Sequence, residues 1–141
     1  AEAVEAHQGE IIKFVGDSVI AIFSSDDPSG DGMPAAALAA AQQALRQHGT
    51  DDTHALHFGI GLDFGEVLYG NIGSEKRIDF TVLGEPVNKA VRIEAMCRTL
   101  GKSLLYSEDI ARRVDTPSQN LGPTPLKGYA QQVALYTTEV V

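Results

Sequence analysis

The sequence predicts an α+β fold, in which helices pack against a mostly antiparallel sheet. Short runs rich in Ile, Val and Phe are separated by tight-turn residues, as in antiparallel hairpins, and these runs are interspersed with helical stretches. The chain has 141 residues, of which 43% are hydrophobic, so it is sized for one domain with a substantial core. We therefore expect a single domain over residues 1–141, with its helices on one side of the sheet.

The individual elements follow from local patterns and their terminating residues. Gly9 ends a short helical segment, and Gly16–Asp17 suits a tight turn between two β-type runs. Pro34 opens an Ala-rich helix that Gly49 closes. In chain order we expect a helix over 1–8, strands over 10–16 and 18–24, a helix over 34–48, strands over 55–63, 66–72 and 78–84, a helix over 86–100, a strand over 103–107, a short helix over 107–114 and a last strand over 132–140.

The second half of the chain also contains residues that mark where its helices and strands begin and end. Phe64–Gly65 lies between two β-type runs, which predicts a second hairpin. Pro86 and Gly101 mark the start and the end of a helix, and Ser107 is a suitable N-cap for a short one. Residues 121–129 form a loop or an edge segment. The closest general template for this order is a ferredoxin-like βαββαβ core.

Charge and cysteine content exclude several classes of protein. The formal net charge is −8, which argues against a nucleic-acid-binding surface and against a polybasic membrane patch. The single cysteine, Cys97, cannot form a disulfide within the chain, and we expect it to be a small buried side chain. No apolar run approaches the roughly 18 residues of a membrane helix. We expect a cytoplasmic domain, attached to a membrane only through segments outside this chain.

Two charged residues belong to the first predicted hairpin. Lys13 stands in the middle of a β-type run, where an unpaired buried ammonium would be costly. It therefore lies either on a solvated face or in a functional site. Asp17 stands at the hairpin tip, where aspartate is ordinary turn chemistry, but where a carboxylate could also hold a divalent metal.

Three further candidates come from the region around the predicted helix 86–100. Asn88 and Arg92 are four residues apart and share one face of that helix. Asn88 lies in the first turn, where amide donors favour anions, and the Arg92 guanidinium can reach the same phosphate. An ordinary polar stripe on a surface helix is the alternative. Thr81 lies in a strand, where threonine is also simply a good strand former.

Several familiar motifs are missing from the sequence. It contains no Ser/His/Asp triad pattern, no HExxH and no P-loop, and its four histidines are scattered. The glycine-rich segment GIGLDFG is not a dinucleotide fingerprint, because no helix follows it.

Taken together, three ordered blocks resemble the class III adenylate/guanylate cyclase catalytic domain. The blocks are EIIKFVGDSVIAIF, HFGIGLDFGEVLYGNIGSEKRIDFTVLGEPVNKAVRIE, and LKGY followed by VALY. This resemblance implies a ferredoxin-like core that forms a head-to-tail homodimer, with active sites between the protomers. It further implies an enzyme that converts ATP to cyclic AMP and pyrophosphate by attack of the ribose 3′-hydroxyl, with two Mg²⁺ or Mn²⁺ ions per site.

The resemblance also assigns roles to the candidate residues. It makes Asp17 a metal ligand, Asn88 the group that orients the ribose, and Arg92 the group that stabilises the transition state. It makes Lys13 and Thr81 the pair that reads the adenine edge, as in a bacterial subgroup of the family. Lys127, in LKGY, would contact the triphosphate.

Two alternatives stay open beside the adenylate cyclase reading. The family's first metal-binding aspartate would precede Ala1, so we expect it in an upstream segment. Without it, the chain would be a catalytically degenerate regulatory or dimerisation module. Guanylate cyclase activity is the other alternative. Diguanylate cyclases carry a GGDEF-type hairpin, whereas the hairpin here is VGDS.

Overall fold

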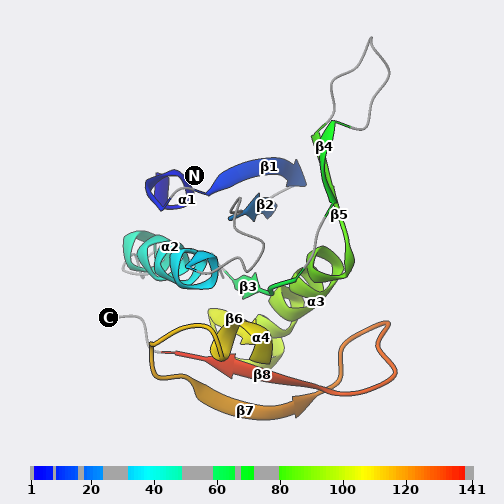
Figure 1. Cartoon of the computed structure of the whole chain (residues 1–141). Coiled ribbons are helices and arrows are strands. Elements are labelled where there is room, and N and C mark those ends of the chain that lie inside the picture. The colour runs from blue at the N-terminus through cyan, green and yellow to red at the C-terminus, as the bar shows by residue number, and fades with distance from the viewer. Residues whose placement is uncertain are drawn as a thin grey trace.

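The computed structural model of the chain describes residues 2–7, 9–15, 18–23, 32–48, 59–65, 68–71 and 80–138. The helices are α1 (Glu2–Ala6), α2 (Met33–His48), α3 (Glu85–Leu100) and α4 (Glu108–Ala111). The strands are β1 (Glu10–Val15), β2 (Ser18–Ile22), β3 (Ile60–Leu62), β4 (Leu68–Asn71), β5 (Phe80–Leu83), β6 (Leu104–Ser107), β7 (Gln119–Thr124) and β8 (Val133–Thr137). Figure 1 shows their arrangement, with the β4–β5 hairpin extending away from the rest of the molecule.

The described strands form one four-stranded sheet and two hairpins. The larger sheet has the order β3-β6-β8-β7, and the hairpins are β1-β2 and β4-β5. Within the described ranges every neighbouring pair is antiparallel except β3 with β6, which run parallel. The predicted α+β class with a mostly antiparallel sheet is therefore confirmed.

The second predicted hairpin is wrong. β3 and β4, which flank Phe64–Gly65, belong to different sheets, because β3 pairs with β6 and β4 pairs with β5. β3 gains two covered faces by joining the larger sheet, and this long-range burial outweighs the local turn preference. Residues 55–58 of the predicted strand over 55–63 lie outside the described residues, as do Gly49 and residues 72–79.

Helices cover both faces of the four-stranded sheet, not one face as the sequence suggested. Leu104 and Tyr106 of β6 pack with Leu38 of α2 and Ile110 of α4. The intervening Leu105 points to the other face, where it packs with residues of α3. All four β6 side chains are consequently buried, as expected for a strand enclosed between two helical layers.

The bounds of α3 match the prediction closely, since its terminating residues act locally. Gly84 at the N-cap has φ 146°, which favours glycine, and Pro86 stands in the first turn. At the other end Gly101 adopts a left-handed conformation with φ 66°. The N–H of the following Lys102 then donates to the carbonyl of Cys97 at 3.0 Å, which satisfies the end of the helix.

The N-terminal elements pack beside α2. α1 contacts α2, and Nε2 of His7 lies 2.8 Å from Oε1 of Gln43 across this contact. Among the described helices, none combines the length and the apolar character needed to cross a membrane.

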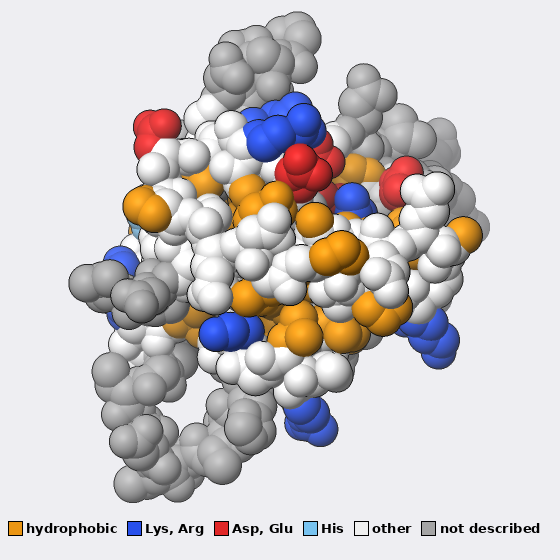
Figure 2. Space-filling model, turned by 90° about the horizontal axis from the view of Figure 1, so that it is seen from below, with side chains coloured by type: hydrophobic (Ala, Val, Ile, Leu, Met, Phe, Trp, Pro, Cys, Tyr) orange, Lys and Arg blue, Asp and Glu red, His pale blue; other side chains and the backbone are white. Residues whose placement is uncertain are grey.

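The other side of the molecule is formed by β7 and β8. β7 lies at one edge of the described four-stranded sheet, and Pro123 within it donates no hydrogen bond, which suits an edge position. Figure 2 shows this face from below, with apolar side chains gathered across its middle and Lys and Arg side chains standing separately around them.

Candidate active site

Helix α3 presents Asn88 and Arg92 one turn apart on its surface. Both side chains are exposed, and their i,i+4 spacing places them on the same face. The N–H of Asn88 bonds back to the carbonyl of Gly84 at 3.4 Å, so Asn88 belongs to the first turn. The structure therefore brings these two predicted site residues together.

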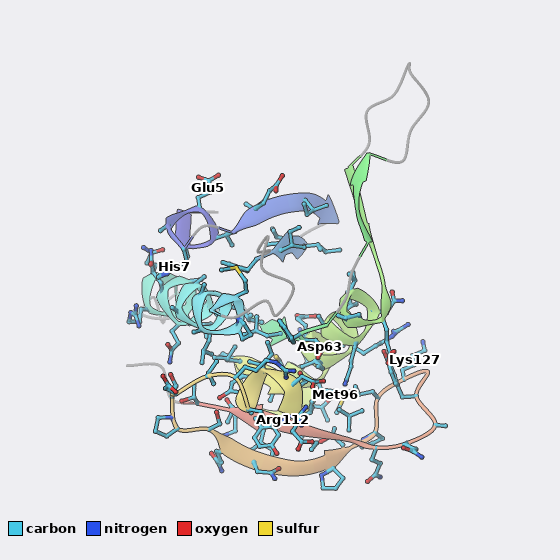
Figure 3. All side chains as sticks on the ribbon, viewed as in Figure 1. Glu5, His7, Asp63, Met96, Arg112 and Lys127 are labelled. Carbon is cyan, nitrogen blue, oxygen red and sulfur yellow. The ribbon has the colours of Figure 1, made fainter. Side chains whose placement is uncertain are left out.

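The turn between β7 and β8, which carries Lys127, docks on the same helix through Leu126. Leu126 is buried in a cluster with Ile93 of α3, and the half-buried Tyr129 packs against that cluster. The N–H of Tyr129 donates to the carbonyl of Leu126 at 3.0 Å, and Gly128 takes φ 89° to close the turn. Lys127 itself is exposed, on the side of the molecule where this turn approaches α3 (Figure 3).

The pKa of Tyr129, in the turn between β7 and β8, is affected by charged residues of α3. Burial raises the pKa of the Tyr129 hydroxyl above its ordinary value, and the carboxylates of Glu85 and Asp63 raise it further. Arg92 acts in the opposite direction and lowers the pKa of Tyr129. The hydroxyl therefore lies within the field of Arg92, so the Lys127 turn and the Arg92 side chain belong to one region.

The strands that carry Lys13 and Thr81 also approach each other. Lys13 is opposite Ile20 in the β1–β2 pairing, and Thr81 is opposite Gly70 in the β4–β5 pairing. β1 and β5 are in contact. The side chains of Lys13 and Thr81 lie outside the described set, and so does Asp17 altogether. Their predicted roles therefore stay predictions.

A polar cluster that sequence reasoning missed lies between α3 and α4. The parallel pairing of β3 with β6 brings their carboxyl ends together, and Asp63 and Ser107 stand at those ends. The Ser107 hydroxyl donates to Oδ1 of Asp63 at 2.6 Å. Asp63 lines a hollow of about 390 Å³ together with Phe64, Gly65, Glu85, Pro86, Lys89 and Asp109. The sequence signal for this cluster was that Asp63 and Ser107 each end a β-type run.

Ser107 does not act as the helix cap that the sequence suggested. It stands at the N-cap position of α4, as predicted, but its side chain makes no capping hydrogen bond there. The hydroxyl proton goes to Asp63 instead, because a half-buried carboxylate is a strong acceptor that would be costly to leave unpaired.

The groups around the hollow shift the pKa of Asp63 in opposite directions. Burial raises the pKa of the Asp63 carboxyl above its usual value. The Ser107 hydroxyl, the Phe64 N–H and the Lys89 ammonium all lower that pKa, whereas Asp109 raises it. Asp63 is thus a half-buried carboxyl with one nearby cation on the helix that carries Asn88 and Arg92.

Asp109 is engaged by two arginines of the following turn. Nη2 of Arg112 lies 2.6 Å from Oδ1 of Asp109, and Nη1 of Arg113 donates to the Asp109 carbonyl at 2.8 Å. The Arg113 guanidinium also lies 4.4 Å from the centre of the Phe64 ring, a cation–π distance. Asp63, Arg112 and Lys127 are labelled in Figure 3, which shows Asp63 near the centre of the molecule.

The described residues do not by themselves assemble a metal centre. Within the described ranges, no group of three or more His, Cys, Asp or Glu side chains is placed to hold an ion. The predicted ligand Asp17 lies outside those ranges.

The α+β core has the fold of solved nucleotide cyclase domains. The model of the adenylate and guanylate cyclase catalytic domain family matches residues 1–138, and the chain belongs to this family. The recognition made from the sequence blocks is confirmed at the level of the family. The finer assignment to a Lys/Thr adenine-selecting subgroup stays a prediction.

Relatives and solved structures agree with this assignment. An uncharacterized protein of Mycobacterium tuberculosis, MT1361, is 34% identical over 136 residues, which cover 94% of this chain and 24% of that protein. The structure of a bacterial light-regulated adenylyl cyclase matches with a TM-score of 0.75 at 32% identity, covering 96% of this chain and 40% of that one. The guanylyl cyclase Cya2 matches with a TM-score of 0.69 at 28% identity, covering 96% and 72%. The chain thus spans about a quarter of the mycobacterial relative.

Proposed function

We propose that the chain is the catalytic domain of an adenylate cyclase, which converts ATP to cyclic AMP and pyrophosphate at a homodimer interface. The observation that carries this proposal is the pairing of Asn88 and Arg92 on one exposed face of α3, with the Lys127 turn docked on the same helix. An amide, a guanidinium and an ammonium in one region suit a ribose and a triphosphate.

Each of these groups has a specific task in the proposed reaction. The ribose 3′-hydroxyl attacks the α-phosphorus, the bond to the leaving pyrophosphate breaks, and a cyclic phosphodiester forms. Asn88 orients the ribose, Lys127 binds the triphosphate, and Arg92 meets the charge that grows in the transition state. A single preorganised donor of this kind is typically worth about 10²–10³-fold in rate.

Divalent metal ions complete the proposed site. Asp17 would supply one carboxylate ligand for Mg²⁺ or Mn²⁺, and the first aspartate of the family pattern would supply another. Such ions neutralise phosphate charge and make the attacking hydroxyl more acidic. Carboxylate oxygens are the ligands that these hard cations prefer.

We propose ATP as the substrate, and not GTP, because of the two residues expected to contact the base. Lys13 and Thr81 are the residues proposed to read the adenine edge, and the contact between β1 and β5 supports a shared location for them. Guanylate cyclase activity is the second candidate function, because the chain is also similar to the guanylyl cyclase Cya2. The rates of cyclic AMP and cyclic GMP formation by the same preparation distinguish the two activities.

The test of catalysis is ATP turnover by the full-length protein with Mg²⁺ or Mn²⁺. We expect Arg92→Ala to lose about 10²-fold or more in kcat, since it removes a donor to the transition state. Arg98→Ala is the matched control, because Arg98 is another exposed arginine of α3. Equal rates for Arg92→Ala and the wild type would refute the proposal. Nucleotide binding without turnover in the wild type would identify a degenerate module instead.

A further inference from the structure

We infer that Asp63 is a positioning residue for the cyclase reaction, whose ionised carboxylate, fixed by Ser107, orients the first turns of α3 through Lys89. This inference rests on the proposed function, because it concerns the helix that carries Asn88 and Arg92. Asp63 forms no hydrogen bond or ion pair with either of these residues, so it would act through its neighbours and not on the substrate.

The direction of the Asp63 carboxylate is set by the fold. β3 and β6 are parallel neighbours, with Leu62 opposite Tyr106, so the residues that follow them lie side by side. Ser107 is only 1% exposed, and its hydroxyl donates to Oδ1 of Asp63 at 2.6 Å. The N–H of Phe64 is a second hydrogen-bond donor to the same carboxyl. One buried side-chain donor and one backbone donor leave this carboxylate little freedom to turn.

The end of β3 is also held close to the start of α3. A Cβ added at Gly65 would lie 2.7 Å from Cγ of Pro86, so the two segments are in tight contact. At Gly61 an added Cβ would lie 2.5 Å from the carbonyl oxygen of Ala90. A charge placed at the end of β3 therefore acts on the first turns of α3 across a short distance.

The charged groups facing Asp63 come from three elements. α3 contributes Glu85 and Lys89, α4 contributes Asp109, and the turn before β8 contributes the Tyr129 hydroxyl. Because Asp109 is already bound by Arg112 and Arg113, its attraction for Lys89 is largely compensated. Glu85 also faces Lys89, but it is exposed and water screens its charge, so Asp63 is the half-buried carboxylate that attracts Lys89 at this end of the hollow.

Lys89 is placed to transmit that attraction to the proposed catalytic face. It directly follows Asn88 and precedes Arg92 by three residues, so it belongs to the same turn of the helix. Among the described residues it makes no direct ion pair, and it faces Asp63 across the hollow. Attraction between the two orients this turn only while Asp63 is ionised. The low-pH limit of activity should therefore report the protonation of Asp63.

The experiment compares kcat, KM and pH profiles of the full-length protein with those of four variants. We expect Asp63→Asn to lower kcat about fivefold with KM within about twofold, the size of one screened charge interaction. Asp63→Glu, which keeps the charge, should retain more activity. Ser107→Ala removes a donor that favours the ionised form, so the acidic limb should move to higher pH. Asp115→Asn, at an exposed aspartate away from the hollow, is the control.

A double-mutant cycle tests the route through Lys89. If Asp63 acts through Lys89, Asp63→Asn should cost nothing further in the Lys89→Gln background. The inference is overturned if Asp63→Asn and Ser107→Ala keep the wild-type rate and pH profile, or if Asp63→Asn and Asp63→Glu lose activity equally while both stay folded. In either case the Arg92→Ala result still decides the proposed function independently.

Discussion

The hydroxyl of Ser107 donates a 2.6 Å hydrogen bond to Oδ1 of Asp63, and this bond ties together the carboxyl ends of two parallel strands. The two residues are 44 positions apart in the sequence. Asp63 lines a hollow that also borders Glu85, Pro86 and Lys89 of α3, the helix that carries the proposed catalytic residues. Asp63 has two separate effects. Burying its carboxylate opposes folding, even though its charge is proposed to serve the reaction.

Asp63→Asn should make the protein more stable at pH 7. The pKa of Asp63 is raised from 3.8 in the folded state, mainly by burial, so the folded state binds the proton more tightly than the unfolded state. The ionised carboxylate therefore costs stability above the folded-state pKa, and this cost disappears as the pH falls below 3.8. Thermal unfolding of both proteins from pH 3 to pH 8 checks this, and a gap that widens toward acid would contradict it.

Gly61→Ala should destabilise the fold, because it forces β3 and α3 apart. The added methyl group would lie 2.5 Å from both the carbonyl oxygen of Ala90 and the nitrogen of Glu94, which are helix backbone atoms that cannot move aside. Overpacking of this kind typically costs about 1–3 kcal/mol. Urea unfolding measures the loss. Gly59→Ala is the comparison, and its smaller expected cost follows from a nearest contact of 3.0 Å, to Cβ of Cys97.

Lys127→Ala should weaken nucleotide binding and leave the fold intact. Lys127 is exposed at the tip of its turn, whereas Leu126 and Tyr129 dock that turn on the core, so removing the ammonium disturbs no packing. We expect KM for ATP to rise about tenfold, as for loss of one charged hydrogen bond to a phosphate. Lys102→Ala, just beyond the other end of α3, should leave KM unchanged. An unchanged KM in both variants would remove Lys127 from the site.

Cys97 should resist alkylation in the native protein. Its side chain is buried, its Sγ donates to the Ile60 carbonyl at 3.6 Å, and burial together with the nearby Glu94 raises its pKa to about 11. At pH 8 only about a thousandth of the thiol is then ionised, and the thiolate is the reactive form. Mass spectrometry of the Cys97 peptide after iodoacetamide treatment should show modification only once the protein is unfolded. Rapid labelling of the folded protein would contradict this.

Local chemistry allowed several features to be predicted correctly from the sequence. Pro86 and Gly101 predicted the bounds of α3, because helix termini depend on the few residues next to them. The 3.6-residue period of a helix was enough to place Asn88 and Arg92 on one face. The pairing of β1 with β2 followed in the same way from the β-type runs over 10–16 and 18–24 and the turn-forming residues between them.

Tertiary structure decided what local patterns could not. Phe64–Gly65 has the composition of a hairpin turn, yet β3 pairs with β6, whose residues lie more than 40 positions further along the chain. Strand partners are chosen by the burial of whole faces, and α2 and α3 cover both faces of the sheet only in this arrangement. The same pairing brings Ser107 to Asp63. The sequence by itself thus determined the family, the bounds of α3 and its polar face. The hollow beside that helix exists only because distant strands become parallel neighbours.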